Sequence, residues 1–364
     1  MLIRIGAALG GLLIVLLVAG ALLVRCLNYF PKPLEKAPVA CFGKGATLRP
    51  GQRFKVLSWN LQYGAGRSYH FFYDGGKAVH ASHDKVDQTL GEIGAVLTAQ
   101  RLDVLLLQEV DRDSARTARI DEVARLRRLG RWSCWTSAPY HRSRYVPVPL
   151  GNALGRVDMH LATAARYRLA WARRHALPGL DEWFVRRAFN LKRAILEAAV
   201  PLEGHPRPLV LLNTHLSAFS FGDGTLERQV DAIRKRLEQL DARGFPWILA
   251  GDFNMLPPGE TGKGLGLEAK YYAATSGPIS RLTERYRTAV SHEAYRSNPS
   301  AYYTYIKYGA ERPDRRIDYI FVSHDIEVHG IRVVHQPRYS SDHLPLLLTA
   351  SVRPLGDRGG RSAP

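Results

Sequence analysis

The sequence predicts an α/β protein in which two mixed β-sheets pack face to face with helices on their outer faces, preceded by one membrane-spanning helix. Three observations support this prediction. At least eight apolar segments have strand composition, only two long segments have helical periodicity, and one uncharged apolar stretch lies near the amino terminus. Two helices are too few to give every strand of a parallel sheet its own crossover, so mixed sheets are expected.

The apolar stretch covers residues 5–24 and is flanked by Arg4 and Arg25. Its 20 residues match the thickness of a bilayer core. A cleaved signal peptide is the alternative, but its apolar region usually has about 7–15 residues and no small-residue cleavage site follows closely, so an uncleaved anchor is favoured. Basic residues after the stretch favour a cytoplasmic domain, whereas an N-terminal signal anchor more often exports the domain that follows, so the sequence leaves the side of the membrane open.

The rest of the chain is expected to form one folded domain over residues 53–353. Residues 25–52 contain Pro31, Pro33, Pro38 and Pro50 among Lys and Gly, which is typical of a linker. Residues 354–364 have the composition of a disordered tail.

Periodicity predicts the elements of this domain. Helices are expected over 84–100 and 226–240, where apolar residues recur every three or four positions. Strands are expected over 54–60, 103–108, 194–200, 209–213, 247–250, 317–322, 331–334 and 344–349.

Composition limits the class of protein. The 364 residues are 46% apolar, enough for a sizeable core, and 51 basic against 33 acidic side chains give a net charge of +18. A protein this basic is drawn to polyanions such as nucleic acid or anionic lipid. Only Cys26, Cys41 and Cys134 are present, without CxxC spacing, so neither a disulfide framework nor a zinc cluster is indicated.

Polar residues follow several of the predicted strands, and the clearest case is WILAGDFNMLPP. Alternation along the chain directs Asp252 and Asn254 the same way, with Phe253 packed behind them. One side chain is suited to accept a proton from water and the other to hold a phosphate oxygen. A plain turn is the alternative, because Asp and Asn are common turn formers.

Two further residues at strand ends are candidates for a metal site. Glu109 closes the apolar run DVLLLQ, and burying a carboxylate there is unfavourable unless a cation or donor compensates it. Asn60 closes FKVLSWN and is suited to bridge metal-bound oxygens. The alternatives are a solvated strand end for Glu109 and a turn cap for Asn60.

Two imidazoles and two acids complete the candidate set. His215 in NTHLSAF and the pair Asp342–His343 in SSDHLPLLL supply groups that bind phosphate or transfer protons near neutral pH. Asp318 in RRIDYIFV is placed to orient a histidine, as the carboxylate of a catalytic triad does. A surface pair with Arg315 or Arg316 is the alternative for Asp318.

These motifs resemble, in residue type and order, those of a known superfamily. The set comprises WN ending at Asn60, QE at Glu109, NTHL from Asn213, GDFN from Gly251, RIDY around Asp318, and SDH ending at His343. It is similar to that of the endonuclease/exonuclease/phosphatase superfamily, the DNase I-like fold of deoxyribonucleases, abasic-site endonucleases, sphingomyelinases and inositol polyphosphate phosphatases. The resemblance spans roughly residues 53–350 and implies a four-layer αββα sandwich with the site at one edge of the sheets.

The resemblance also implies roles. Glu109 would be the principal Mg²⁺ ligand, with Asn60 beside it and Asp342 at or near the metal, and Mn²⁺ could substitute. Asp252 would orient or deprotonate the attacking water, and Asn254 would contact phosphate or water. His215 and His343 would grip the phosphate, Asp318 would orient His343, and Asn213 of NTHL joins the catalytic set. The implied reaction is in-line attack by water on a phosphodiester or phosphomonoester.

Two departures from the family pattern argue against abasic-site specificity. Abasic-site endonucleases place an Asp two residues after the first-strand Asn, where this chain has Gln62. The usual central segment resembling GxAILSRYPI is replaced by VDMHLATAARYRL, although Gly151-Asn152-Ala153 keeps a partial likeness.

The substrate is less well defined than the reaction. Residues 63–83 and 302–308 mix aromatic rings with basic residues, which suits base stacking or a membrane interface. A self-packed Ω-loop is the alternative for the first segment, and the same ambiguity holds for the second. Tethering through residues 5–24 favours a lipid phosphodiester, such as that of sphingomyelin, because it raises the effective concentration of substrate. A DNA or RNA nuclease and a catalytically silent polyanion-binding module are the alternatives. No protein partner is indicated, and a monomer is expected.

Overall fold

The computed structural model describes residues 2–218, 222–272, 277–335 and 340–355. The helices are α1 (Leu2–Leu27), α2 (His83–Ala99), α3 (Glu122–Arg128), α4 (Phe184–Phe189), α5 (Thr225–Ala242), α6 (Ser280–Thr283) and α7 (His292–Ser297). The strands are β1 (Leu34–Ala37), β2 (Val39–Cys41), β3 (Phe54–Asn60), β4 (Val104–Asp111), β5 (Cys134–Val146), β6 (Gly155–Ala165), β7 (Trp171–Ala176), β8 (Ala194–Val200), β9 (Leu209–His215), β10 (Trp247–Asp252), β11 (Arg287–Thr288), β12 (Asp318–Val322), β13 (Ile326–Val333) and β14 (Leu346–Val352).

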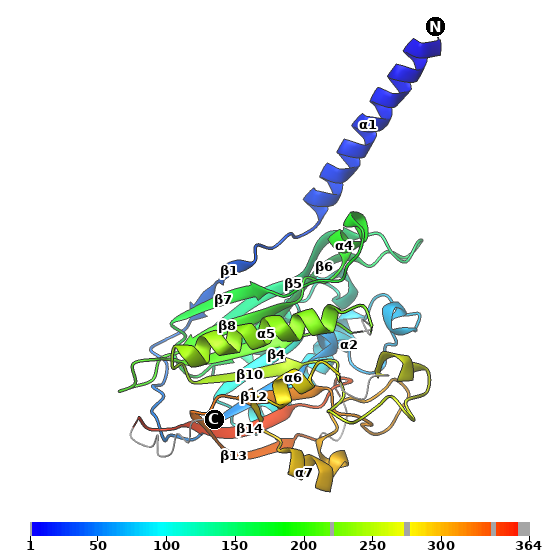
Figure 1. Ribbon diagram of the computed structural model, residues 1–364. Helices are drawn as coiled ribbons and strands as arrows, with labels where there is room; N and C mark the ends of the chain where they lie inside the picture. The colour runs from blue at the N-terminus through cyan, green and yellow to red at the C-terminus, as the bar shows by residue number, and fades with distance from the viewer. Residues whose placement is uncertain (1, 219–221, 273–276, 336–339, 356–364) are drawn as a thin grey trace.

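The strands form two mixed sheets of seven strands each (Figure 1). One sheet has the order β1-β7-β8-β9-β10-β12-β11 and the other β13-β14-β3-β4-β6-β5-β2. Near the middle of each sheet lies a parallel pair, β9 with β10 and β3 with β4, and the other described pairs are antiparallel. In both parallel pairs the crossover is a long amphipathic helix, α5 in the first sheet and α2 in the second.

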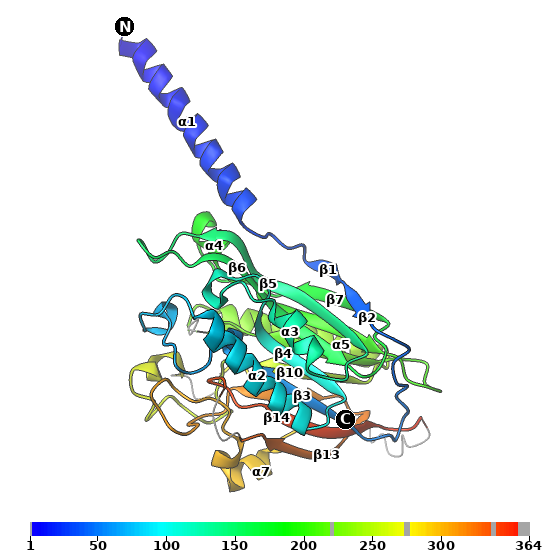
Figure 2. The ribbon, with the colours of Figure 1, turned by 180° about the vertical axis from the view of Figure 1, so that it is seen from behind.

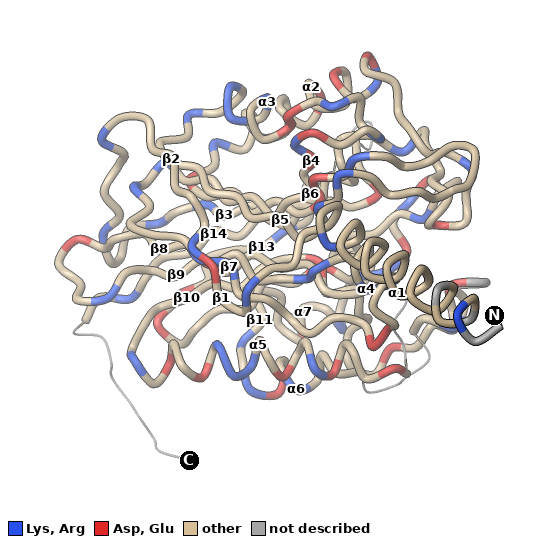
Figure 3. The backbone as a smooth tube through the Cα atoms, turned by 90° about the horizontal axis from the view of Figure 1, so that it is seen from above, with Lys and Arg blue, Asp and Glu red and all other residues tan. Residues whose placement is uncertain are grey.

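The sheets and helices stack as a four-layer αββα sandwich. Seen from above, α2 and α3 lie outside one sheet, and α5 and α6 lie outside the other (Figure 3). The reverse view shows the same covering of the second sheet by α2 and α3 (Figure 2). The predicted fold class is therefore confirmed.

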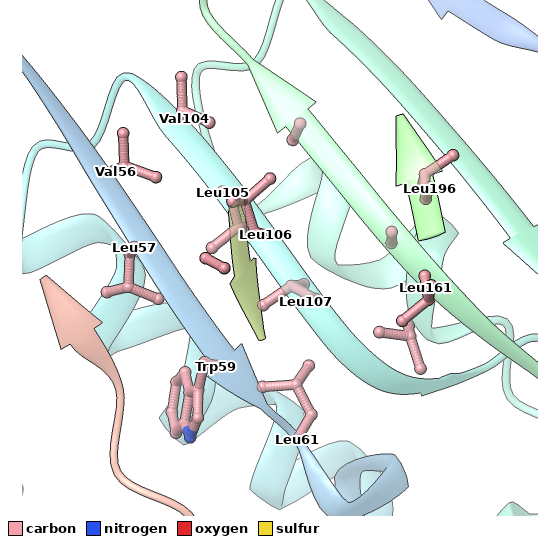
Figure 4. Packing of buried hydrophobic residues seen from close by; sticks show 14 of the residues in the cluster. Val56, Leu57, Trp59, Leu61, Val104, Leu105, Leu106, Leu107, Leu161 and Leu196 are labelled. Carbon is pink, nitrogen blue, oxygen red and sulfur yellow. The ribbon is translucent and has the colours of Figure 1, made fainter. Parts of the chain in front are cut away.

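Alternation along the strands explains the layers. On β9, Leu209 and Leu211 belong to the core between the two sheets, whereas Val210 and Leu212 pack in a separate cluster with α5. Each strand of this kind is apolar on both faces, so its sequence is a continuous apolar run. Figure 4 shows the main core, with Trp59 and Leu61 of the β3 end beside the leucines of β4.

The predicted helices and the eight predicted strands are all present, with ends shifted by a few residues. The strands β5, β6 and β7 were not predicted. Residues of β5 such as His141, Arg142 and Arg144 interrupt its apolar pattern, and its pairing with β6 is broken by two irregularities. The degraded central segment VDMHLATAA is therefore an ordinary strand, β6, in the middle of a sheet.

The segment expected to be a linker is instead part of the fold. β1 pairs with β7 and β2 pairs with β5, so the chain joins both sheets before Arg53. Cys41 and Cys134 face each other in this pairing and form a disulfide, although the cysteine spacing in the sequence did not indicate a disulfide framework. The sequence does not reveal this bond because the two residues are 93 positions apart and meet only through strand pairing.

One helix, near the amino terminus, is long and apolar enough to cross a membrane. The segment Leu9–Leu27 of α1 has a mean hydropathy of 2.5 and none of it is buried against the domain. A signal sequence meets the same criteria. Of the predicted disordered tail over residues 354–364, the part from residue 356 onward lies outside the described residues.

Candidate active site

The predicted motifs meet at one edge of the sandwich, where β3, β4, β9 and β10 end and β12 begins. A cavity of about 640 Å³ opens there. Seven of the nine candidates line it, and an eighth is hydrogen-bonded to one of these seven. Those lining it are Asn60, Glu109, His215, Asp252, Asn254, Asp342 and His343, and Asp318 lies directly behind His343.

The GDFN turn depends on a glycine. A Cβ at Gly251 would lie 1.9 Å from the carbonyl oxygen of Thr214, and the φ angle of +152° is unfavourable for other residues. The close approach lets β10 lie against β9 with Asp252 directly beside His215. Phe253 is fully buried behind the turn against Tyr319, as predicted.

Asp252 is the centre of the cluster. Its carboxylate accepts hydrogen bonds from the Asn60 side chain at 3.1 Å and from the Asn254 backbone N–H at 2.9 Å. His215 Nε2 lies 3.3 Å from the same carboxylate. Burial raises the pKa of Asp252 to about 7, against the opposing effect of the nearby His343 charge. A carboxylate with a pKa near neutrality is suited to accept a proton from water.

His343 is held by two acids. Its Nδ1 lies 2.8 Å from Asp318 Oδ2, and its Nε2 lies 3.6 Å from Asp252 Oδ2. Burial disfavours the charged imidazolium, but the carboxylates of Asp318 and Asp252 outweigh this and raise the pKa of His343 well above its usual value. His343 is therefore a buried cation directed into the cavity, and Asp318 orients it.

His215 has the opposite character. Its Nδ1 lies 3.1 Å from the Tyr140 hydroxyl and 3.7 Å from Glu109 Oε1, and its Nε2 lies 3.2 Å from Asn254 Nδ2. Burial and the charges of Arg193 and His343 lower its pKa well below the usual value. The site thus contains one neutral and one charged imidazole.

Glu109 and Asp342 form a pair of acids on the cavity wall. Glu109 lies at a bulge in β4 and has a φ of +54°, a conformation uncommon outside glycine, which turns its carboxylate toward the site. Burial and the charge of Asp342 raise the pKa of Glu109 to about 7, and burial also raises that of Asp342. Two partly exposed carboxylates that repel each other are a donor set suited to a divalent cation, and the Asn60 side chain on the same cavity wall offers a further hard oxygen.

Asp252, Asp318 and His343 offer a second set of ligand atoms, all within 4.8 Å of one another. Here, however, His343 Nδ1 is already hydrogen-bonded to Asp318, and Asp252 accepts two other hydrogen bonds. The site therefore offers two neighbouring sets of donor atoms, one from Glu109, Asn60 and Asp342 and one from Asp252, Asp318 and His343.

Asn213 was predicted to be catalytic, and the structure assigns it a structural role. The residue is fully buried and does not line the cavity. Its amide donates to the carbonyls of Leu107 and Ala162, each at 2.9 Å, and accepts from Gln108 at 2.7 Å. These bonds join the two sheets, because Asn213 lies on β9 and its partners lie on β4 and β6.

Two arginines of the site escaped the sequence analysis. Arg193 lines the cavity with only 7% of its surface exposed, and its Nη1 has no hydrogen-bond partner among the described residues. Arg116 is paired with Asp111 at 2.8 Å and lies over the Tyr63 ring at 3.7 Å. A buried guanidinium with a free N–H group is a ready partner for an anionic oxygen.

The aromatic segments form part of the cavity wall. Tyr63, Phe71 and Tyr73 pack on one another at 5.3–6.2 Å, which fits the self-packed loop, and they also line the cavity. Tyr305, from the second segment, packs edge-on against the His343 ring at 5.2 Å.

Comparison with known proteins agrees with this geometry. Residues 57–343 match the model of a family described as the Endonuclease/Exonuclease/phosphatase family. Among solved structures, an endonuclease/exonuclease/phosphatase from Beutenbergia cavernae is 22% identical, with a TM-score of 0.57, over 83% of this chain and 72% of that chain. The human nocturnin catalytic domain with bound sulfate is 18% identical, with a TM-score of 0.53, over 87% and 97%. Truncated Caenorhabditis elegans TDP2 is 15% identical, with a TM-score of 0.52, over 83% and 99%. No curated protein sequence gives a significant match.

Proposed function

The chain belongs to the endonuclease/exonuclease/phosphatase family, and from this membership we propose that it is a divalent-metal-dependent phosphodiesterase that hydrolyses its substrate by in-line attack of water. The observation that carries the proposal is the meeting of Glu109, Asp252 and His343, from three distant segments, in one cavity. A silent binding module would not need a near-neutral Asp252 beside a charged His343.

The residues divide the chemistry among themselves. Asp252, with its pKa near 7, accepts the proton of the attacking water, and Asn254 and Asn60 hold its carboxylate in place. His343, kept charged by Asp318, stabilises the negative charge that develops on the phosphoryl oxygens.

Glu109, Asp342 and Asn60 would hold Mg²⁺, with Mn²⁺ able to substitute. When bound, the ion neutralises phosphoryl oxygens and lowers the barrier to attack. The unpartnered Arg193 Nη1 provides a further donor to the phosphate.

A lipid phosphodiester is the substrate class that we favour. The cavity is wide enough for a headgroup and is bounded by aromatic and aliphatic side chains as well as the charged cluster. A membrane span in α1 would hold this cavity close to a bilayer. A nuclease is the second candidate, supported by the net charge of +18 and by the rings of Tyr63 and Tyr73 on the cavity wall.

We also infer that α1 is an uncleaved anchor and that the domain faces an oxidising compartment. The Cys41–Cys134 disulfide supports this side of the membrane, because disulfides persist outside the reducing cytosol and are rare within it.

The test is a substrate panel. The detergent-purified full chain, stripped of metal with a chelator, is offered sphingomyelin and phosphatidylcholine vesicles, plasmid DNA, RNA and a soluble chromogenic phosphodiester, with and without Mg²⁺ or Mn²⁺. We expect metal-dependent release of product from the lipids and the chromogenic ester. Cleavage of nucleic acid alone would establish the second candidate, and inactivity on every substrate would refute the proposal.

A further inference from the structure

Large apolar side chains are exposed on two neighbouring parts of the domain. Leu150, at the tip of the β5–β6 hairpin, is 91% exposed, and Trp183, just before α4, is 67% exposed. Tyr145, Val148 and Phe184 in the same segments are 41–49% exposed. We call these five residues the apolar rim. Exposed leucine and tryptophan side chains on two neighbouring segments need a reason, since a soluble surface gains nothing from them.

The rim lies beside the end of α1. The Tyr29 N–H donates to the Arg142 carbonyl at 3.1 Å, and the ring of Phe30 stacks on Phe184 with centroids 6.2 Å apart. Figures 1 and 2 both show α4 and the β5–β6 hairpin next to the carboxyl end of α1, and β13 on the opposite side of the domain. If α1 crosses a bilayer, the rim therefore lies at the bilayer surface.

The rim adjoins one wall of the cavity. Val148 itself, with Val146 and Leu154 of the hairpin, lines the cavity, as do Leu180 and Phe189 around α4. His141 Nε2 lies 2.9 Å from the Phe189 carbonyl oxygen and ties α4 to β5. Contacts made by the rim are therefore made at the mouth of the active site.

We propose that the apolar rim inserts into the headgroup region of the membrane next to α1, so that the cavity opens onto the lipid surface. The occupant is a lipid bilayer, because the rim continues from the membrane helix and combines Trp, Tyr and Leu with the exposed cations Arg144 and Arg187. This is the composition of interfacial membrane-binding segments. The proposal rests on the proposed function for its catalytic meaning, since a docked cavity would take its substrate from the bilayer.

Depth measurements on the full chain test the insertion without requiring activity. In a Cys26→Ser background, a nitroxide label is placed by Leu150→Cys or Trp183→Cys, with Glu327→Cys on β13 as the matched exposed control. The protein is reconstituted in phosphatidylcholine vesicles with and without phosphatidylglycerol. We expect the labels at 150 and 183 to be accessible to oxygen and protected from a water-soluble nickel complex, and the label at 327 to show the reverse. Equal nickel access at all three positions would overturn the proposal, as would dipolar broadening from a second copy of the chain.

A kinetic comparison tests the consequence. Leu150 and Trp183 do not line the cavity, so the double variant Leu150→Ser/Trp183→Ser should keep its rate on the soluble chromogenic diester. Its rate on lipid vesicles should fall by about tenfold, because two apolar contacts with the interface are lost. An unchanged rate on vesicles would overturn the proposal. If the wild-type chain cleaves neither substrate, the proposed function fails while the label depths still decide the docking.

Discussion

Glu197 and Glu109 both lie largely out of contact with solvent, but their charges are compensated in different ways. Glu197, in the middle of β8, is fully buried, and Arg236 and His175 lie 2.7 Å and 3.1 Å from it. Glu109, at the site, has a carboxylate for a neighbour and no matching cation at ion-pair distance among the described residues except a histidine at 3.7 Å. Burial acts against the charge of both, but the partners of Glu197 lower its pKa to about 2, whereas the pKa of Glu109 rises to about 7.

The contrast separates charges that stabilise the fold from charges held ready for a ligand. The charge of a buried acid such as Glu197 is fully compensated by partners within the chain, so it needs no ligand. Acids on a cavity wall whose charge is only partly compensated, such as Glu109 and Asp252, are less favourable in the free protein than when a cation or substrate is present. Changes in the two regions should therefore separate stability from activity.

The largest expected effect on activity comes from Asp252→Asn. The amide keeps the size of the side chain but cannot accept the proton of water, so turnover should fall by about 10³-fold. Stability should change by less than about 1 kcal/mol, because loss of a hydrogen bond is offset by removal of a buried charge. Initial rates on the chromogenic diester and urea unfolding measure the two effects. Retained turnover would show that another group is the base.

Glu197→Gln should give the reverse pattern. The change leaves Arg236, whose side chain is only 14% exposed, without its ionic partner. We expect the free energy of unfolding to fall by about 3 kcal/mol, as for other broken buried pairs. Turnover per folded molecule should stay the same, because Glu197 lies away from the cavity. A large loss of turnover in the folded variant would erase the distinction between the two regions.

The pH dependence of stability provides a sharper test of the ion pair between Glu197 and Arg236. The pKa of Glu197 is about 2 in the folded chain, against 4.5 for an ordinary glutamate. As the pH falls, Glu197 is therefore protonated in the unfolded chain before it is protonated in the folded chain. The stabilisation of the fold by ionised Glu197 is complete above pH 4.5 and is lost between pH 4.5 and pH 2. By about pH 3, the difference in unfolding free energy between wild type and Glu197→Gln should have shrunk by about 2 kcal/mol. A difference that is constant down to that pH would mean that the ion pair does not form.

The sequence was sufficient to predict which residues lie at the edge of the sheets, but not which of the candidates are buried between the sheets. Asn60, Asp252 and His343 each adjoin an apolar strand, so their meeting at one sheet edge was predictable. Asn213 shares the strand face of His215 but lies two residues earlier, and at about 3.3 Å per residue it is about 7 Å deeper between the sheets. Its partner Gln108 comes from the other sheet, so no local pattern could reveal the bond.

The disulfide and Arg193 were not predicted for the same reason, because their surroundings are formed by segments that are distant in the sequence. Cys41 and Cys134 meet through the pairing of β2 with β5, and Arg193 reaches the cavity from the chain just before β8. In KRAILEAAV this arginine is indistinguishable from the exposed cations that commonly flank a strand. Only its burial without a partner for Nη1 distinguishes it.

Arg193→Lys should therefore have the smallest effect on activity among the changes made within the site. Lysine keeps the positive charge but loses the planar fork that can donate two hydrogen bonds to a phosphate, so kcat/KM should fall by about tenfold. Arg207→Lys, an exposed change near the start of β9, is the matched control and should leave kcat/KM unchanged. Because the guanidinium of Arg193 is buried without a complete set of partners, its replacement should not lower the melting temperature by more than the control does. Equal kcat/KM in the two variants would mean that Arg193 is, like Glu197, a charge that serves the fold.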